Sequence, residues 1–146
     1  MLRFVVCIPS LVVVLSLVVG AQGTVTTPEE HAKVMKSNAQ ANGASNKAIG
    51  SGAYADARTQ LATLRQNFVV LQGFWTEKKR DDAVGILKDG VSRIDALDKI
   101  LSAGTVDQMA AQAAAKEFGG NTCGACHKLY REGDATAGYK FKEGVL

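Results

Sequence analysis

A stripe of apolar side chains between positions 54 and 75 constrains the fold more than any other feature of the sequence. Its members alternate spacings of three and four residues without a break: Tyr54, Ala57, Leu61, Leu64, Phe68, Leu71 and Trp75. This spacing puts all of them on one side of an α-helix, in the heptad arrangement of a helix that packs against other helices. The chain is therefore expected to bury one long helical face in a core.

An earlier helix is predicted from its start signals. Thr27 is a suitable N-cap and Pro28 suits the first helical position, where its missing N–H costs nothing. We expect its buried face at Ala32, Met35, Ala39, Asn42, Asn46 and Ile49. The helix is expected to end either near Ala41 or, in the longer alternative, at Ile49, where Gly50-Ser51-Gly52 stops it.

Two further helices complete the pattern. One carries the apolar stripe Val84, Leu87, Val91, Ile94, Leu97 and Leu101, and the other is expected to start at a Thr105 cap with Val106, Met109 and Ala113 on its apolar side and to continue to Arg131. Four helical patterns with short connections and no alternating strand pattern predict an all-α, antiparallel four-helix bundle. The tail from Glu132 to Leu146 is expected to be loosely held.

The first 23 residues have the plan of a secretory signal peptide. Arg3 precedes a long apolar run that closes on small residues at Ala21 to Gly23. A retained membrane anchor is the competing interpretation, although Pro9 and Ser10 interrupt the run. We expect cleavage, a periplasmic or otherwise exported protein without a membrane span, and one domain over residues 24–146.

The charge balance after cleavage excludes one large class of partners. Sixteen Lys and Arg residues then face fourteen Asp and Glu residues, mixed along the chain. Nucleic acid is not an expected partner, because the basic surface that binds phosphates is missing. No nucleophile with a base, paired carboxylates or phosphate loop occurs at a telling spacing, so the chain is not expected to be an enzyme.

The segment "CGACH" at positions 123–127 carries the chemistry. Cys-x-x-Cys-His is the attachment signature of a c-type haem. On a helix, Cys123, Cys126 and His127 share one face, so two thiols can bind the porphyrin while the imidazole becomes the fifth iron ligand. Glycines at 119, 120 and 124 would let the backbone approach the macrocycle. Haem c is therefore the predicted cofactor.

Two rivals use the same residues. A thioredoxin-like dithiol needs the cysteine pair at a helix N-terminus, which lowers a thiol pKa, whereas this pair lies near the end of a helical pattern. Structural zinc needs four ligands, usually from two paired spacings. After cleavage the cysteines and histidines are only Cys123, Cys126, His127 and His31, which offer no second pair. A lone disulfide would close too short a loop to stabilise much.

The sixth iron ligand decides between functions. Met35, His31 and Met109 carry atoms able to bind iron. In an antiparallel bundle the start of the first helix lies beside the end of the last, so Met35 falls at a depth similar to that of His127. Met109 is excluded because it stands about 27 Å from His127 on the same helix. Met35 as a core residue and His31 as a rim residue or ligand remain open.

The motif and its surroundings resemble the class II cytochromes c. That family has Cys-x-x-Cys-His followed by an aromatic residue and an arginine, here Tyr130 and Arg131, and "VMKSNAQANGASNKAI" resembles its first helix. The resemblance implies the longer first helix and a methionine ligand at Met35, as in low-spin electron carriers of the family. His31 stands where cytochrome c prime often has an arginine, which weakens the likeness to that gas-binding branch.

The expected function is therefore electron transfer by a low-spin haem with His127 and Met35 as iron ligands. The alternative is a five-coordinate haem protein, similar to cytochrome c prime, that binds nitric oxide or carbon monoxide. Arg131 is expected either to meet a haem propionate or the proximal face, or to lie in solvent. Redox proteins are the expected partners, and the sequence leaves open whether the bundle forms a homodimer.

Overall fold

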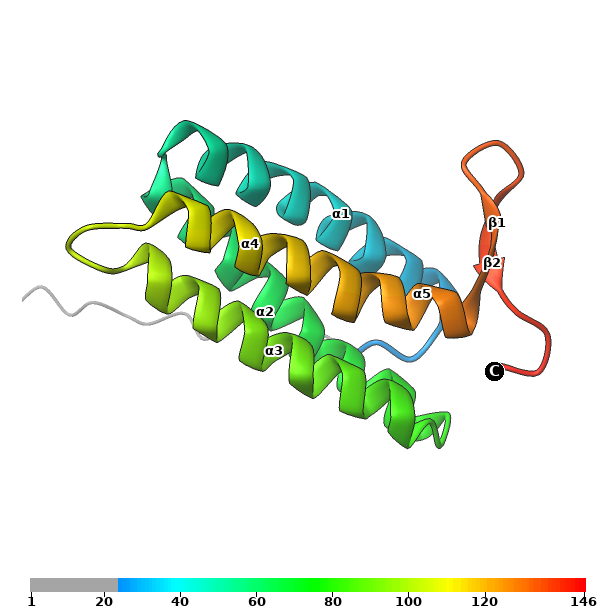
Figure 1. Cartoon of the computed structure of the whole chain (residues 1–146). Helices are drawn as coiled ribbons and strands as arrows, with labels where there is room; N and C mark the ends of the chain where they lie inside the picture. The colour runs from blue at the N-terminus through cyan, green and yellow to red at the C-terminus, as the bar shows by residue number, and fades with distance from the viewer. Residues whose placement is uncertain (1–23) are drawn as a thin grey trace, which may run out of the picture.

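The structure, a computed structural model, describes residues 24–146 and is mostly helical. The predicted signal segment, residues 1–23, lies outside the described residues. The elements are α1 (Pro28–Ser51), α2 (Tyr54–Glu77), α3 (Asp81–Leu101), α4 (Gln108–Phe118), the π-helical segment η1 (Gly119–Gly124), α5 (Ala125–Tyr130), β1 (Arg131–Asp134) and β2 (Gly138–Phe141). Segments α4, η1 and α5 form one continuous rod (Figure 1).

The helices lie side by side in a bundle, which confirms the all-α prediction (Figure 1). α1 packs along α2, α2 along α3, and α4 contacts both α3 and α1. We call the end that holds His31, Trp75, Asp82 and residues 123–130 the motif end. The opposite end, where α1 finishes and α4 starts, is the far end. None of the helices within residues 24–146 is long and apolar enough to cross a membrane.

Helix α1 has the predicted start and the longer of the two predicted lengths. Thr27 and Glu30 form a reciprocal capping box, and Gly52 ends the helix in the left-handed conformation. Its buried face differs from the prediction, because Ala32, Ala39 and Asn46 are exposed. The buried residues are His31, Asn38, Ala41, Ser45, Ala48 and Ile49. Small and polar side chains occupy this contact, so hydrophobic spacing alone misplaced it by one position.

Helices α2 and α3 form the best-defined part of the core. The predicted stripe of α2 is buried except for a half-buried Tyr54, and Phe74 joins it. On α3 the buried face includes Ala83 and Gly90, while Val84 and Val91 are only half-buried. A Cβ added at Gly90 would lie 2.6 Å from Thr122 Cγ2 and 2.8 Å from Phe68 Cε1. Glycine is needed there because α3 closely approaches η1 and α2.

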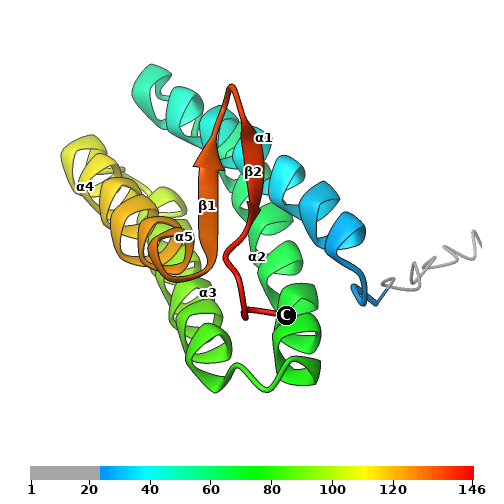
Figure 2. The same ribbon diagram turned by 90° about the vertical axis from the view of Figure 1, so that its right-hand side faces the viewer.

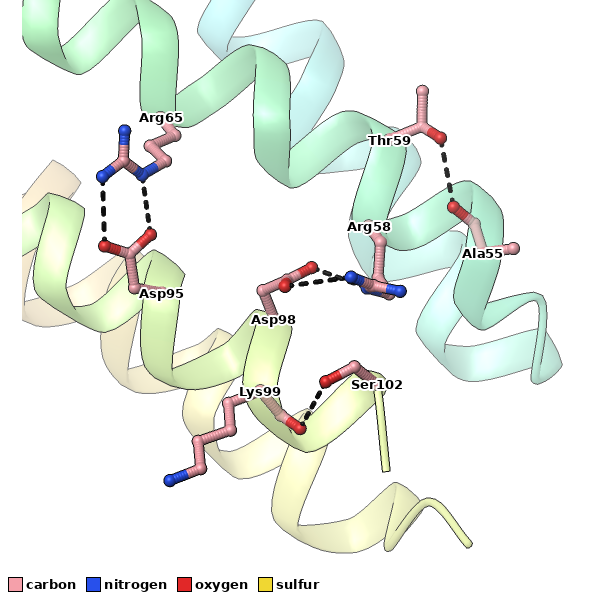
Figure 3. Close-up of polar contacts among 8 residues, drawn as sticks. All are labelled: Ala55, Arg58, Thr59, Arg65, Asp95, Asp98, Lys99 and Ser102. Atoms are coloured by element: carbon pink, nitrogen blue, oxygen red, sulfur yellow. Dashed lines mark hydrogen bonds and ion pairs between the residues drawn. The ribbon is translucent and has the colours of Figure 1, made fainter. Parts of the chain in front are cut away.

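Two ion pairs mark the antiparallel register of α2 and α3 on the surface. Arg58 Nε lies 2.8 Å from Asp98 Oδ1, and Arg65 Nε lies 2.7 Å from Asp95 Oδ1 (Figure 3). Each arginine makes a second contact through its Nη2 atom. All four side chains are largely solvated, so these pairs fix orientation more than they add stability.

Helix α4 starts two residues later than predicted and buries another face. Asp107, not Thr105, is the N-cap, and its side chain accepts a hydrogen bond from Ala110 N–H. Met109 is 82% exposed and Ala113 is exposed, so their assignment to the core was wrong. Ala111, Ala115 and Phe118 form the buried face instead. A run of alanines has little hydrophobic contrast, which explains the error.

The C-terminal tail is not loose as predicted but forms a hairpin at the motif end (Figure 2). Strand β1 pairs antiparallel with β2, and Val145 beyond them is buried. Arg80 donates to the carbonyls of Gly144 and Val145 at 2.6 and 3.2 Å. Phe141 stacks on Phe74 with ring centroids 6.1 Å apart. These contacts attach the tail to the bundle.

Candidate cofactor site

The Cys-x-x-Cys-His motif spans a change of helix type in the last rod. Cys123 lies in the π-helical segment η1, whereas Cys126 and His127 lie in α5. The helical path continues across Gly119 and Gly120, as predicted, and π-helical turns of this kind occur often at functional sites. A Cβ added at either glycine would meet no heavy atom within 4 Å, so packing does not require glycine there.

Both thiols are free and partly buried against the core. Burial raises the pKa of Cys123. Burial, Cys123 and the Asp82 carboxylate together raise the pKa of Cys126 to about 11. Thiols of this kind stay protonated near neutral pH, in contrast to the low-pKa cysteine of a thioredoxin-like site. This observation favours a role other than thiol–disulfide exchange.

His127 is half-buried beside the two cysteines. Burial, and then the positive charge of Arg131, lower its pKa. The imidazole is therefore neutral at physiological pH, which is the protonation state that binds a metal.

His31 comes from the other end of the chain and lies at the same end of the bundle. Burial, followed by the charge of His127, lowers the pKa of His31 to about 4. This electrostatic effect of His127 agrees with the predicted proximity of the first helix start to the last helix end. His31 is 7% exposed, and its Nε2 atom has no hydrogen-bond partner among residues 24–146. Burying such an atom is costly unless something else binds it.

Three aromatic rings fix the position of His31. Its ring centroid lies 4.8 Å from that of Phe74, 4.9 Å from that of Phe141 and 5.6 Å from that of Trp75. Trp75 in turn packs on Tyr130 at 4.7 Å. The ring of His31 is thus part of a buried aromatic cluster, and it is not the rim residue that one prediction described.

The other predicted residues occupy different positions. Met35 is half-buried and packs against the core one turn after His31. The side chain of Met109 is largely exposed on α4. The Arg131 guanidinium lies 4.0 Å from the centroid of the Tyr139 ring. Arg131 also lies close enough to His127 for its positive charge to lower the pKa of that imidazole.

Several residues of the site were not predicted. Asp82 of α3 lies close enough to Cys126 to raise its pKa, and Trp75 of α2 packs on both Tyr130 and Phe141. Burial and the Asp82 carboxylate raise the pKa of Tyr130, although its hydroxyl forms no hydrogen bond of regular geometry. Tyr130 follows His127 by three residues and Trp75 ends the α2 stripe, so the spacing of both could have placed them near the motif. The sequence offered no such indication for Phe141, because its contacts depend on the hairpin.

The donor set fits a c-type haem. Two neighbouring thiols, one neutral imidazole beside them and an unpartnered imidazole nitrogen nearby lie at one end of the bundle. Within residues 24–146 no three Cys, His, Asp or Glu side chains are grouped to hold a metal ion by themselves. A haem iron requires only one or two protein ligands.

Comparison with protein-family models, curated proteins and solved structures found no match to this chain. The likeness to class II cytochromes c thus depends on the motif, the first-helix residues and the bundle.

Proposed function

We propose that this protein is an electron carrier with a covalently attached haem c. Cys123 and Cys126 form the thioether bonds, His127 is the fifth iron ligand and Met35 is the sixth. The observation that carries the proposal is the joint placement of two free thiols and the neutral His127 beside the start of α1. Neither a dithiol site nor a structural zinc site accounts for all of these residues.

The protein's own residues have separate tasks in this scheme. The raised thiol pKa values of Cys123 and Cys126 keep them from disulfide exchange before attachment. His127 offers a neutral imidazole, and Met35 offers a soft thioether from the neighbouring helix. When bound, haem c supplies an iron that exchanges one electron between its ferric and ferrous states.

The surroundings favour a high potential. A methionine ligand raises the potential relative to two histidines. The buried aromatic side chains at the motif end exclude water and disfavour extra charge, which stabilises the reduced state. Arg131 lies near His127 and adds positive charge, which acts in the same direction.

Secretion and partners follow from the same proposal. Covalent haem attachment agrees with an exported protein and with the predicted signal segment at residues 1–23. Redox proteins are the proposed partners. The proposal assigns the protein no substrate chemistry of its own.

An absorption spectrum of the exported protein tests the proposal. Material produced with a haem-attachment apparatus should show a low-spin c-type spectrum and a weak far-red sulfur-to-iron band when oxidised. The Met35→Ala variant should lose that band, whereas Met109→Ala, at an exposed position, should keep it. A high-spin wild-type spectrum that shifts readily with carbon monoxide would instead support the gas-binding alternative.

A further inference from the structure

His31 differs from the other buried polar groups that have no partner. The other unpartnered buried polar atoms among residues 24–146 are Asn38 Nδ2, Ser45 Oγ, Trp75 Nε1, Thr122 Oγ1 and Tyr130 Oη. Indole and amide N–H groups only donate hydrogen bonds and neutral hydroxyls bind iron weakly, whereas the free nitrogen of a neutral imidazole is a strong metal ligand. The unpartnered Nε2 atom of His31 is therefore the one best suited to bind a metal.

His31 lies on the same face of α1 as Met35. The two residues are four positions apart on α1, so they share a face one turn apart. His31 is also close enough to His127 for the charge of one to act on the other. One face of α1 thus carries a nitrogen donor and a sulfur donor on neighbouring turns, in the half of the helix nearer the motif end.

We propose that His31 is an alternative sixth ligand, whose Nε2 atom binds the haem iron whenever Met35 does not. The proposal rests on the proposed function. In the exchange, the bond between iron and the Met35 sulfur would break and the Nε2 lone pair of His31 would form the new bond. The ring proton would stay on Nδ1, and no electron would be transferred. One chain then has two coordination states: a methionine state of higher potential and a histidine state of lower potential.

The aromatic cluster supports this role. Phe74, Phe141 and Trp75 hold the His31 ring on three sides, so little side-chain freedom remains to be lost on binding. The cluster includes Phe141 of the hairpin, which ties the C-terminal tail to the ligand from α1. Removing the imidazole while keeping a ring is possible with His31→Phe, which preserves packing.

Four proteins test the proposal: wild type, Met35→Ala, His31→Phe and the double variant. Absorption and electron paramagnetic resonance spectra of the oxidised proteins identify the ligands. We expect the sulfur-to-iron band in wild type and in His31→Phe. Met35→Ala should lose the band yet remain low-spin with the resonance signature of two imidazoles, and its reduced form should resist carbon monoxide. The double variant should be high-spin and bind carbon monoxide readily.

The outcomes separate this proposal from the proposed function. A high-spin Met35→Ala protein overturns the role of His31 and leaves Met35 as ligand intact. A wild type with two imidazole ligands and no sulfur band, which becomes high-spin in His31→Phe, overturns Met35 but supports His31 as a ligand. Circular dichroism of all four proteins should show equal helix content, and Met109→Ala serves as the matched control for losing a methionine.

Discussion

The two ends of the bundle differ in whether their large polar side chains have hydrogen-bond partners. At the far end the Gln108 amide donates to the carbonyls of Ile49 and Gly50 at 3.0 and 2.9 Å, and so closes the end of α1. At the motif end, the imidazole of His31, the indole of Trp75 and the phenol of Tyr130 bury polar atoms without hydrogen-bond partners among residues 24–146. Nearer the far end, the small hydroxyl of Ser45 is buried in the same way. Stability explains the first arrangement but not the second, because unpartnered buried groups cost free energy. We infer from the three large polar side chains left unpartnered at one end that the motif end is shaped for a ligand.

The largest effect should come from removing the attachment chemistry. We expect the double variant Cys123→Ser, Cys126→Ser to contain no covalently bound haem after export, because a hydroxyl does not replace the thiol. Denaturing electrophoresis with haem staining measures this directly. Arg58→Ala, between the far end and the middle of the bundle, is the matched control and should stain like wild type. If the serine variant still stained for haem, the attachment of haem at Cys123 and Cys126 would be refuted.

The pH dependence of stability should also differ between the two ends. The pKa of His31 is lowered from 6.5 to about 4, so the unfolded chain takes up its proton first as the pH falls. The contribution of His31 to the free energy of unfolding is therefore complete above pH 6.5 and is lost between pH 6.5 and about 4. The free energy lost over this window is about 3 kcal/mol. Denaturant unfolding across this window should show a steeper loss in wild type than in His31→Phe. Equal slopes would contradict burial of a neutral His31.

A smaller effect is expected where α3 meets η1. In Gly90→Ala the new methyl group would clash with Thr122 and Phe68, so η1 or α3 must shift. Overpacking of this kind costs about 1 to 3 kcal/mol. Denaturant unfolding gives the loss, and the haem spectrum reports whether Cys123, next to Thr122, has moved. Gly43→Ala, where a Cβ meets nothing within 4 Å, is the control and should not destabilise the protein.

The smallest effect should follow loss of a surface ion pair. Arg65→Ala removes the contact with Asp95, but both side chains are about half exposed. We expect less than about 1 kcal/mol and no spectral change. Thermal unfolding at low and high salt measures it, and a large loss would show that α2 and α3 depend on this pair.

Sequence reasoning predicted the fold best where hydrophobic contrast was strong. The α2 stripe from Ala57 to Trp75 is buried as expected, and the capping signals at Thr27 fixed the start of α1. It misplaced the faces of α1 and α4, where alanine and small polar residues carry the contacts. The hairpin was missed because its stability comes from long-range contacts, such as those of Phe141 with Phe74 and Trp75.

The same limit applies to the site. Local spacing sufficed to place Cys123, Cys126 and His127 together, because all three lie within five residues. Predicting that His31 is buried would have required knowing which face of α1 packs against α2 and the C-terminal tail.

The intact mass of the exported protein, measured after unfolding in acid, tests the central claim most directly. We predict the mass of the processed chain plus one haem, with no free thiol that reacts with an alkylating reagent. The mass of the chain alone, with Cys123 and Cys126 both open to alkylation after reduction, would contradict the account.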